Sequence, residues 1–204
     1  IMSLFKKISI EDRIMHDDGW QGDIPEGMSG KKLGILGLGK LGSRVARVGL
    51  ALEMDVIAWS KNLTKDRCKE IGASYVEKDE LFATSDVVSI HLVLSDRTRG
   101  LVGANELNLM KSTAYLVNTS RGPIVDEAAL VEALANEKIA GAGLDVYDVE
   151  PLPKAHPLRT LNNAVLTGHT GYVVKELNAL AYGEALEDVS AWMQGDPVRV
   201  LNAS

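Results

Sequence analysis

Cysteine is almost absent from this sequence, because Cys68 is its single example among 204 residues. One cysteine excludes an intrachain disulfide framework and any zinc site that needs several thiolates. Cys68 lies in a helical-looking segment, residues 65–71, where no partner for a reactive thiol can be named. We therefore expect a buried or idle thiol and no metal site.

The chain also lacks a basic excess and a long hydrophobic run. Its 28 Asp and Glu outnumber its 22 Lys and Arg, for a net charge of −6, which argues against nucleic acid as the main partner because phosphate binding needs a basic face. No apolar run approaches the roughly 20 residues of a membrane span. The opening residues, IMSLFKK, are unlike a signal peptide because the lysines follow a short apolar stretch. We expect a cytoplasmic protein without a nucleic-acid or membrane partner.

The stretch from Lys31 to Ser60 contains the most informative motif. Residues 33–36 form an apolar run typical of a buried parallel strand, and Gly37, Gly39 and Gly42 then form a G-x-G-x-x-G before a helical segment. In this context the glycines permit a tight turn, a close approach of backbone to a pyrophosphate, and close packing of helix on strand. The helix N-terminus offers unpaired N–H groups to phosphates. The alternative is a glycine-rich turn that binds no ligand.

Strand-like runs alternate with helical segments along the rest of the chain. The helix after the glycines is expected to carry Val45, Val48, Gly49 and Leu52 on one face. The expected strands are residues 33–36, 56–58, 75–76, 87–94, 114–118, 139–146 and 164–166. The expected further helices are residues 65–71, 78–84, 104–110, a helix capped by Asp126, and 174–193. This alternation predicts an α/β fold with a doubly wound parallel sheet, which binds ligands outside the carboxyl ends of its strands.

Residues 1–29 do not look like a domain. Their apolar positions, among them Leu4, Phe5 and Trp20, suit one or two short amphipathic helices, but no nearby segment is expected to close a core over them. Turn-forming residues follow in Gly22 to Gly27. We expect a helix and linker that pack on another part of the protein.

Three polar residues in the loops after expected strands fit the needs of a hydride transfer. Arg121 can grip a carboxylate through two parallel hydrogen bonds. His169 can exchange a proton near neutral pH, and Glu150 can pair with its imidazole. Each has a plainer alternative, since a loop arginine is usually a solvated charge and a lone histidine is more often structural. The other histidines are expected to be structural, His16 and His156 at the surface or in loops and His91 packed near the cofactor.

Five stretches resemble the D-isomer-specific 2-hydroxyacid dehydrogenases and occur in that family's order between about residues 30 and 172: LGILGLGKLG, SDVVSIHLVLSDRTRGLVG, YLVNTSRGPIVDEAALVEAL, AGAGLDVYDVEP and GHTGY. The resemblance implies a Rossmann-like domain and an oxidoreductase that moves a hydride between NAD(P)H and a 2-oxo acid or D-2-hydroxy acid. It implies that Arg121 binds the substrate carboxylate and carbonyl, and that His169 is the proton donor and acceptor with Glu150 as its partner. It also implies a homodimer formed mainly by the dinucleotide domain.

The resemblance also assigns cofactor-binding residues. Lys40 and Leu41, together with the turn glycines, would meet the pyrophosphate through backbone N–H groups, and Asp145 would contact the nicotinamide end. The rest of the groove would be lined by Leu92, Val93, Thr98, Thr119, Ser120, Arg121, His169 and Gly171.

The chain departs from the family pattern at the end of the second strand. The family usually has an acidic residue there for the adenosine ribose, whereas this chain has Ser60, Lys61 and Asn62. Loss of the carboxylate removes repulsion against a 2′-phosphate, and Lys61 can pair with one. This favours NADP over NAD. The alternative is that Ser60 and Asn62 bind a plain ribose while Lys61 points into solvent.

Two further departures concern the substrate side. Family members commonly have proline where this chain has Val93 and Gly168, and glycine leaves the backbone before His169 less restricted. The chain is also short, so that residues 1–29 match only the trailing helix and linker of a flavodoxin-like substrate domain. Residues 30–172 would be the NAD(P)-binding domain, and residues 173–204 a helix and tail that return toward the substrate domain.

Two functions remain open from the sequence. The first is the dehydrogenase, present here as a cofactor-binding fragment. The second is a non-catalytic dinucleotide sensor that contacts a partner protein, since the same fold serves both. Retention of Arg121, Glu150 and His169 favours the enzyme. Val93, Gly168 and the missing domain favour the sensor slightly.

Overall fold

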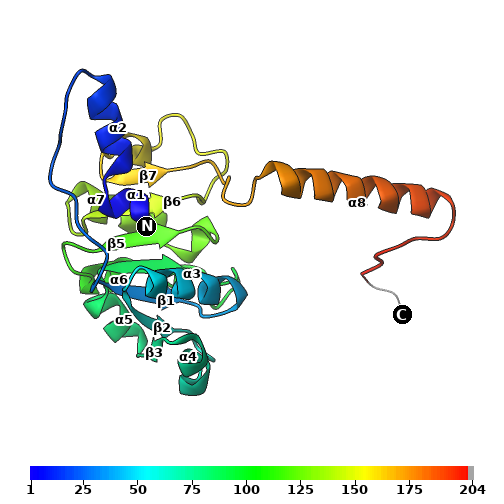
Figure 1. Ribbon diagram of the computed structural model, residues 1–204, viewed down its shortest axis with the longest axis horizontal. Helices are drawn as coiled ribbons and strands as arrows, with labels where there is room; N and C mark the ends of the chain where they lie inside the picture. Colours follow the sequence, from blue (N-terminus) through cyan, green and yellow to red (C-terminus); the bar gives the residue numbers. More distant parts are fainter. Residues whose placement is uncertain (202–204) are drawn as a thin grey trace. The chain divides into compact units, whose positions relative to one another are not determined.

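A computed structural model describes residues 1–201 and divides the chain into two units, residues 1–168 and a second unit that begins at His169. The first unit is built on one seven-stranded parallel sheet with helices on both faces (Figure 1). Its strands are β1 (Lys32–Leu36), β2 (Asp55–Trp59), β3 (Ser74–Tyr75), β4 (Val87–Ile90), β5 (Tyr115–Asn118), β6 (Gly141–Leu144) and β7 (Ala164–Leu166). The predicted α/β fold is confirmed.

The strand order is β3-β2-β1-β4-β5-β6-β7. The chain builds outward from β1 to β3, then crosses to the other side of β1 and continues from β4 to β7. The direction of winding therefore reverses between β1 and β4, and this is where a doubly wound sheet opens a crevice for ligands. In register, Leu36 of β1 lies beside Ile90 of β4, so that both strands end at the crevice.

The helices bury one apolar core on each face of the sheet. The helices and 3-10 turns of the first unit are α1 (Met2–Phe5), α2 (Ile8–His16), α3 (Lys40–Ala51), α4 (Lys65–Ile71), α5 (Lys78–Thr84), α6 (Ala104–Leu109), η1 (Gly122–Ile124), α7 (Glu127–Ala135) and η2 (Pro157–Thr160). Residues of α1, α3 and α4 contribute to one core, and residues of α5, α6 and α7 to the other. Cys68 is buried in the first of these cores, as expected for an idle thiol.

Two predicted strands are longer than the observed ones. The apolar run at 87–94 pairs only as far as Ile90, and the run at 139–146 pairs only over Gly141–Leu144. Asn118 of β5 lies in register with both Ile90 and Leu144, and β5 ends there. Beyond that point the ladder has no partner, so apolar character alone overestimated the strand length.

The buried face of α3 differs from its prediction at Val48, which is 58% exposed. Gly49 is buried as predicted, together with Gly42, Ser43 and Ala46, and Val45 and Leu52 are half-buried against the core. A Cβ on Gly49 would lie 2.5 Å from a methyl of Leu33, and one on Gly42 would overlap the Gly37 carbonyl. The helix packs so close to β1 that small residues, rather than Val48, fit between them.

The expectation that no core closes over the N-terminal segment is wrong for Leu4 and Phe5. Both side chains are buried, and the Phe5 ring lies 5.1 Å from the ring of Tyr115 on β5. Gly143 on β6 leaves room for Leu4, because a Cβ there would lie 3.2 Å from the Leu4 Cδ1. The helix α1 thus belongs to the first unit. By contrast, α2 buries no residue.

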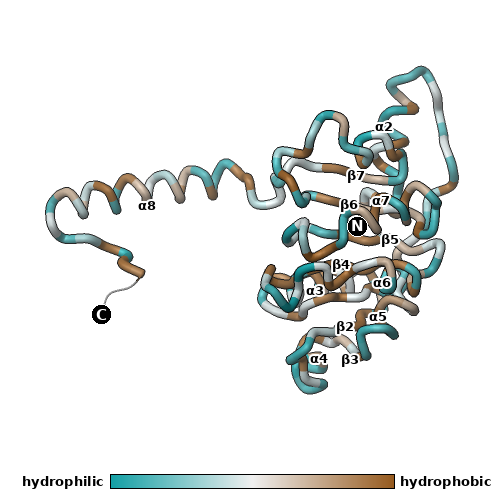
Figure 2. The backbone as a smooth tube through the Cα atoms, turned by 180° about the vertical axis from the view of Figure 1, so that it is seen from behind, coloured by the Kyte–Doolittle hydropathy of each residue, from teal (hydrophilic) through white to brown (hydrophobic). Residues whose placement is uncertain are grey.

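The second unit is described only by itself. It contains α8 (Lys175–Met193), in which no residue is buried. Apolar residues recur along this helix (Figure 2), including Leu180, Leu186 and Trp192. Arg199 in the following tail pairs with Glu187 and Asp188 of the helix at 2.7 and 2.8 Å. Among residues 1–201, neither α8 nor any other helix combines the length and apolar character required to cross a membrane.

Candidate active site

The glycine turn lies at the crevice between β1 and β4. Gly37 has φ +105°, and a Cβ there would lie 2.8 Å from the carbonyl oxygen of His91, so a side chain has no room. Gly39 is the N-cap of α3, and a Cβ on Gly39 would meet nothing within 4 Å. The backbone at Gly39 is therefore accessible beside the first N–H groups of a 12-residue helix. This arrangement fits a pyrophosphate.

His91 follows β4 and borders the glycine turn. Its backbone N–H donates to the Leu36 carbonyl at 2.8 Å, and its Nε2 lies 2.9 Å from the Ser89 hydroxyl. Burial lowers the pKa of His91 to about 4. The imidazole is therefore neutral at physiological pH and adds no charge beside the turn, in agreement with a packed residue.

The segment after β2 presents no carboxylate. Lys61 and Asn62 are exposed, and Ser60 is half-buried with its carbonyl accepting from Leu63 N–H at 3.0 Å. The Thr64 hydroxyl then caps α4 by accepting from the Arg67 N–H at 3.2 Å. The polar groups beside Trp59 are thus neutral or cationic, and they fit hydroxyl or phosphate oxygens.

The segment after β4 is folded onto itself by Thr98. The Thr98 hydroxyl donates to the Val93 carbonyl at 2.7 Å and accepts from the Ser95 N–H at 2.8 Å. Val93 is 84% exposed and Leu92 is half-buried. This turn presents Val93 outward, beyond the end of β4, without a backbone ladder to hold it.

Asn118 organises the loop that carries Arg121. The Asn118 side chain is buried at the end of β5, where its Oδ1 accepts from the Ser120 N–H at 3.0 Å and its Nδ2 donates to the Arg121 carbonyl at 2.9 Å. The Ser120 hydroxyl donates to the Ile90 carbonyl at 3.0 Å, which ties the loop to β4. Arg121 is exposed, and its Nη1 donates to the Ser120 carbonyl at 2.6 Å. Thr119 is exposed beside it.

Asp145 and Glu150 lie on the segment after β6. Asp145 is 5% exposed, and its Oδ1 accepts from the Thr167 hydroxyl. The Glu150 Oε1 accepts from the Tyr147 N–H at 2.9 Å. The Tyr147 hydroxyl donates to the Thr167 carbonyl at 2.8 Å, so that the ends of β6 and β7 are tied together by two side chains.

His169 and Gly171 belong to the second unit. His169 has φ +56°, an uncommon backbone conformation for a residue with a side chain. Its ring lies edge-on to the ring of Tyr172 at 5.7 Å. The grouping of His169 with Arg121 and Glu150 stays a prediction. Within the first unit, hydrogen bonds join the ends of β1, β2, β4, β5, β6 and β7, and the other candidate residues follow these strand ends.

Sequence reasoning did not single out Asn118, Tyr147 or Thr167. Asn118 gave one signal, a polar residue at the end of an apolar strand that had to be satisfied when buried. Tyr147 and Thr167 gave none, because they are 20 residues apart and meet only when β6 and β7 pair. No group of three potential metal ligands (His, Cys, Asp or Glu) occurs among residues 1–201.

With this geometry in place, similarity to known proteins decides the family. Residues 1–171 match the family described as "D-isomer specific 2-hydroxyacid dehydrogenase, NAD binding domain". The chain belongs to the D-isomer-specific 2-hydroxyacid dehydrogenases. A glyoxylate reductase of Aeropyrum pernix is 46% identical over 187 residues, which are 90% of this chain and 56% of that protein.

Solved structures of this dehydrogenase family have the same fold. A glyoxylate reductase from Paecilomyes thermophila is 35% identical with a TM-score of 0.83, and the match covers 98% of this chain and 62% of that one. A D-lactate dehydrogenase from Aquifex aeolicus, solved with NAD and lactic acid, is 32% identical with a TM-score of 0.83 over 96% of this chain and 64% of that one. The chain thus spans about half to two thirds of the length of these relatives.

The residues of the first unit fit the NAD that gives the dehydrogenase domain its description. The fit rests on the room at Gly39 and on the first N–H groups of α3, which lie beside it. Oxidoreductase chemistry with NAD(H) is what the family shares.

Proposed function

We propose that the whole enzyme containing this chain transfers a hydride between NAD(P)H and a 2-oxo acid, with a D-2-hydroxy acid as the reduced product. The observation that carries the proposal is the family match over residues 1–171, which includes Arg121, Glu150 and His169. The chain spans 56% of its Aeropyrum relative, so the substrate also depends on residues outside it. Nicotinamide, when bound, supplies or accepts the hydride.

Each of the three residues has a distinct task in this proposal. The exposed Arg121 guanidinium binds the substrate carboxylate and carbonyl, since its backbone is fixed by Asn118 while its charge faces outward. His169 gives a proton to the substrate oxygen during reduction and takes it back during oxidation. Glu150 pairs with that imidazole and favours its charged form. Asp145, which is buried and held by Thr167, contacts the nicotinamide end.

A variant of His169 tests the enzyme against the non-catalytic sensor. Oxidation of NADH and NADPH is followed with glyoxylate and with hydroxypyruvate for the whole enzyme and its His169→Ala variant. Loss of the proton donor is expected to lower turnover about 100-fold or more. His16→Ala is the matched control, because the His16 ring is 81% exposed and pairs only loosely with Asp12 at 3.7 Å. Equal turnover in His169→Ala and the parent contradicts the enzyme and supports a sensor.

We further propose a preference for NADP. The support is the neutral or cationic segment Ser60, Lys61 and Asn62, with Lys61 exposed where a 2′-phosphate would lie. Lys61→Glu is expected to raise KM for NADPH about tenfold or more while KM for NADH changes little. Lys69→Glu, on the last turn of α4, is the control. A parent enzyme that strongly prefers NADH contradicts the role of Lys61.

We propose the domain organisation and assembly on the same basis. In this organisation residues 1–29 come from the end of a substrate domain and pack through Leu4 and Phe5 on the cofactor domain of residues 30–172, and residues 173–204 are the helix and tail that return to the substrate domain. The support is the apolar surface of α8. Exposed apolar residues near the N-terminus support a homodimer: Ile8, Met15, Trp20 and Ile24. Sedimentation of the parent and of Trp20→Ser checks the dimer.

We assign the enzyme to the cytoplasm because NAD(P)H supply and a free buried Cys68 are compatible with it.

A further inference from the structure

One carboxylate holds both ends of the loop that carries Glu150. Glu127 is the first residue of α7, and its side chain is only 19% exposed. Its Oε2 accepts from the Asp148 N–H at 3.2 Å, and its Oε1 lies 3.0 Å from the His156 Nε2. The loop of residues 148–156 therefore begins and ends on the same side chain.

The hydrogen bonds of His156 define which ring nitrogen carries the proton. Its Nδ1 accepts from the Leu158 N–H at 3.3 Å, so Nδ1 has no proton, and Nε2 donates its own proton to Glu127. The ring is 17% exposed and caps η2, whose Leu158 is fully buried. His156 lies in a loop, as expected, but its ring is an anchored connection between that loop and α7.

The loop between these two ends is fastened along its length. Leu152 is 9% exposed, and Arg159 donates to the Leu152 and Pro153 carbonyls at 2.7 and 2.9 Å. Glu150 lies between the Asp148 end and Leu152, and its carboxylate accepts from the Tyr147 N–H at 2.9 Å. The position of the Glu150 carboxylate thus depends on where the backbone at 147–148 is held.

We propose that Glu127 is a positioning residue for Glu150, acting through the Asp148 N–H and the His156 ring. The inference rests on the proposed function only in that Glu150 is taken as the partner of His169. Glutamine cannot replace Glu127 fully, because its NH2 group would face one of two donors, the Asp148 N–H or the His156 Nε2–H. One of the two connections is then lost while the shape is kept.

The Tyr147 amide reports on Glu150 without touching Glu127. Hydrogen exchange of the 204-residue chain, resolved by residue with NMR, compares Glu127→Ala, Glu127→Gln and Glu150→Ala with the parent. Glu150→Ala sets the rate for an unpaired Tyr147 amide. Glu127→Ala is expected to raise the Tyr147 exchange rate about tenfold toward that limit, relative to Leu116 in the centre of β5. Glu127→Gln is expected to raise it less. Glu132→Ala, exposed on the same helix, is the matched control.

Three outcomes are separable. A Tyr147 rate at the parental level in Glu127→Ala overturns the proposal, whatever Glu150 does in catalysis. If Glu127→Ala unfolds or accelerates Leu116 equally, Glu127→Gln decides, and a parental Tyr147 rate there overturns the proposal as well. Full turnover by Glu150→Gln in the whole enzyme contradicts the proposed function while leaving the positioning of the loop intact. Cofactor affinity is expected to be unchanged in both Glu127 variants, since Glu127 begins α7 whereas the glycine turn lies between β1 and α3.

Discussion

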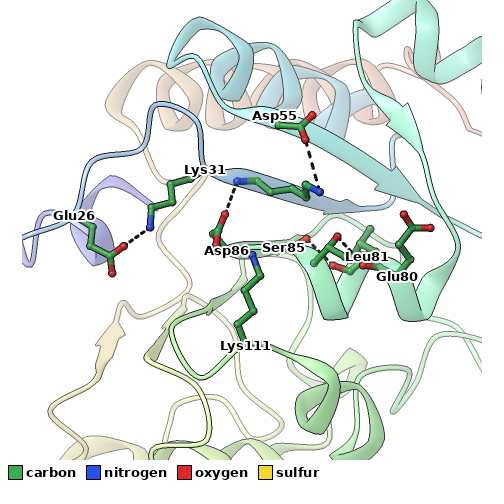
Figure 3. Close-up of polar contacts among 10 residues, drawn as sticks. Glu26, Lys31, Asp55, Glu80, Leu81, Ser85, Asp86 and Lys111 are labelled. Atoms are coloured by element: carbon green, nitrogen blue, oxygen red, sulfur yellow. Dashed lines mark hydrogen bonds and ion pairs between the residues drawn. The ribbon is translucent and has the colours of Figure 1, made fainter.

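The Asp86 carboxylate lies 2.8 Å from the Lys111 ammonium, at the edge of the sheet opposite the candidate site (Figure 3). Its other oxygen accepts from the Lys32 N–H at 2.7 Å. One carboxylate therefore connects the first residue of β1, the residue before β4 and the loop before β5. These are the central strands whose carboxyl ends form the crevice, so Asp86 fixes the register of the strands from the far end.

Asp86→Asn is expected to lower the free energy of unfolding at pH 7 by about 1–3 kcal/mol. Burial by itself would raise the pKa of Asp86, but hydrogen bonds from Lys111 and Lys32 outweigh it and lower the pKa. With a lowered folded-state pKa, this stabilisation is present above the unfolded-state value, about 3.9, and is lost as pH falls through the folded-state value. Urea unfolding at pH 7 and at pH 3.5 measures both. Asp55→Asn, at a site 58% exposed, is the control, and equal losses at the two sites would contradict the role of Asp86.

Two glycines of the turn, Gly42 and Gly39, are expected to separate folding from binding. Gly42→Ala places a methyl against the Gly37 carbonyl and is expected to cost about 1–3 kcal/mol of stability. Gly39→Ala meets nothing within 4 Å in the protein alone, so the expected loss of stability is only the cost of alanine at an N-cap, about 1 kcal/mol or less. The added methyl instead occupies the approach of the pyrophosphate, and NADH affinity is expected to fall about tenfold or more.

Urea unfolding and NADH fluorescence titration, run on the same samples, separate these effects. Gly27→Ala is the matched control, because a Cβ there also meets nothing within 4 Å and the residue precedes β1. Retention of full NADH affinity in Gly39→Ala would place the dinucleotide away from this turn.

The fold was predictable because strand and helix patterns are local. Segments such as 65–71, 78–84 and 164–166 begin and end as the sequence predicts, since each is closed by a cap or turn residue nearby. The strand end at Ile90 was not predictable, because it is decided by where neighbouring strands stop pairing. Val48 was misplaced for a similar reason, since the distance between α3 and the sheet decides which face is buried.

The candidate site was predictable where a motif carried it, as for Gly37, Gly39 and Gly42. Its supporting residues were not. Glu127 and His156 are 29 positions apart, and their connection depends on a loop and a helix start that meet only in the folded chain. A glutamate after an N-cap and a histidine before a proline each have an ordinary local explanation.

Gly168→Pro is expected to leave turnover of the whole enzyme unchanged or to raise it. A Cβ at Gly168 would meet nothing within 4 Å, so the first atom of a side chain has room there. Proline also restricts the backbone just before His169, whose own φ is +56°. Steady-state rates with glyoxylate measure the effect, with Gly168→Ala as the control for the added carbon. A large fall in turnover in the proline variant alone would mean that the reaction requires a glycine conformation at this position.

Protonation of His91 is expected to destabilise the protein between about pH 6.5 and pH 4. Burial lowers the pKa of His91 to about 4 from 6.5, so the folded protein prefers the neutral ring that contacts Ser89. For a lowered folded-state pKa, the contribution to stability is present above the unfolded-state value and is lost as pH falls through the folded-state value. The shift corresponds to about 3 kcal/mol at its fullest. His91→Asn keeps a polar side chain near Ser89 but cannot titrate, so its stability is expected to fall less steeply than that of the parent over this range.

Urea unfolding at half-unit steps from pH 7.5 to pH 4 measures the difference between the stability curves of the parent and His91→Asn. His16→Asn removes a histidine that is 81% exposed and is expected to follow the parental curve. Parallel curves for the parent and His91→Asn would mean that the ring beside the glycine turn is solvated, and the turn would then tolerate a positive charge next to the cofactor phosphates.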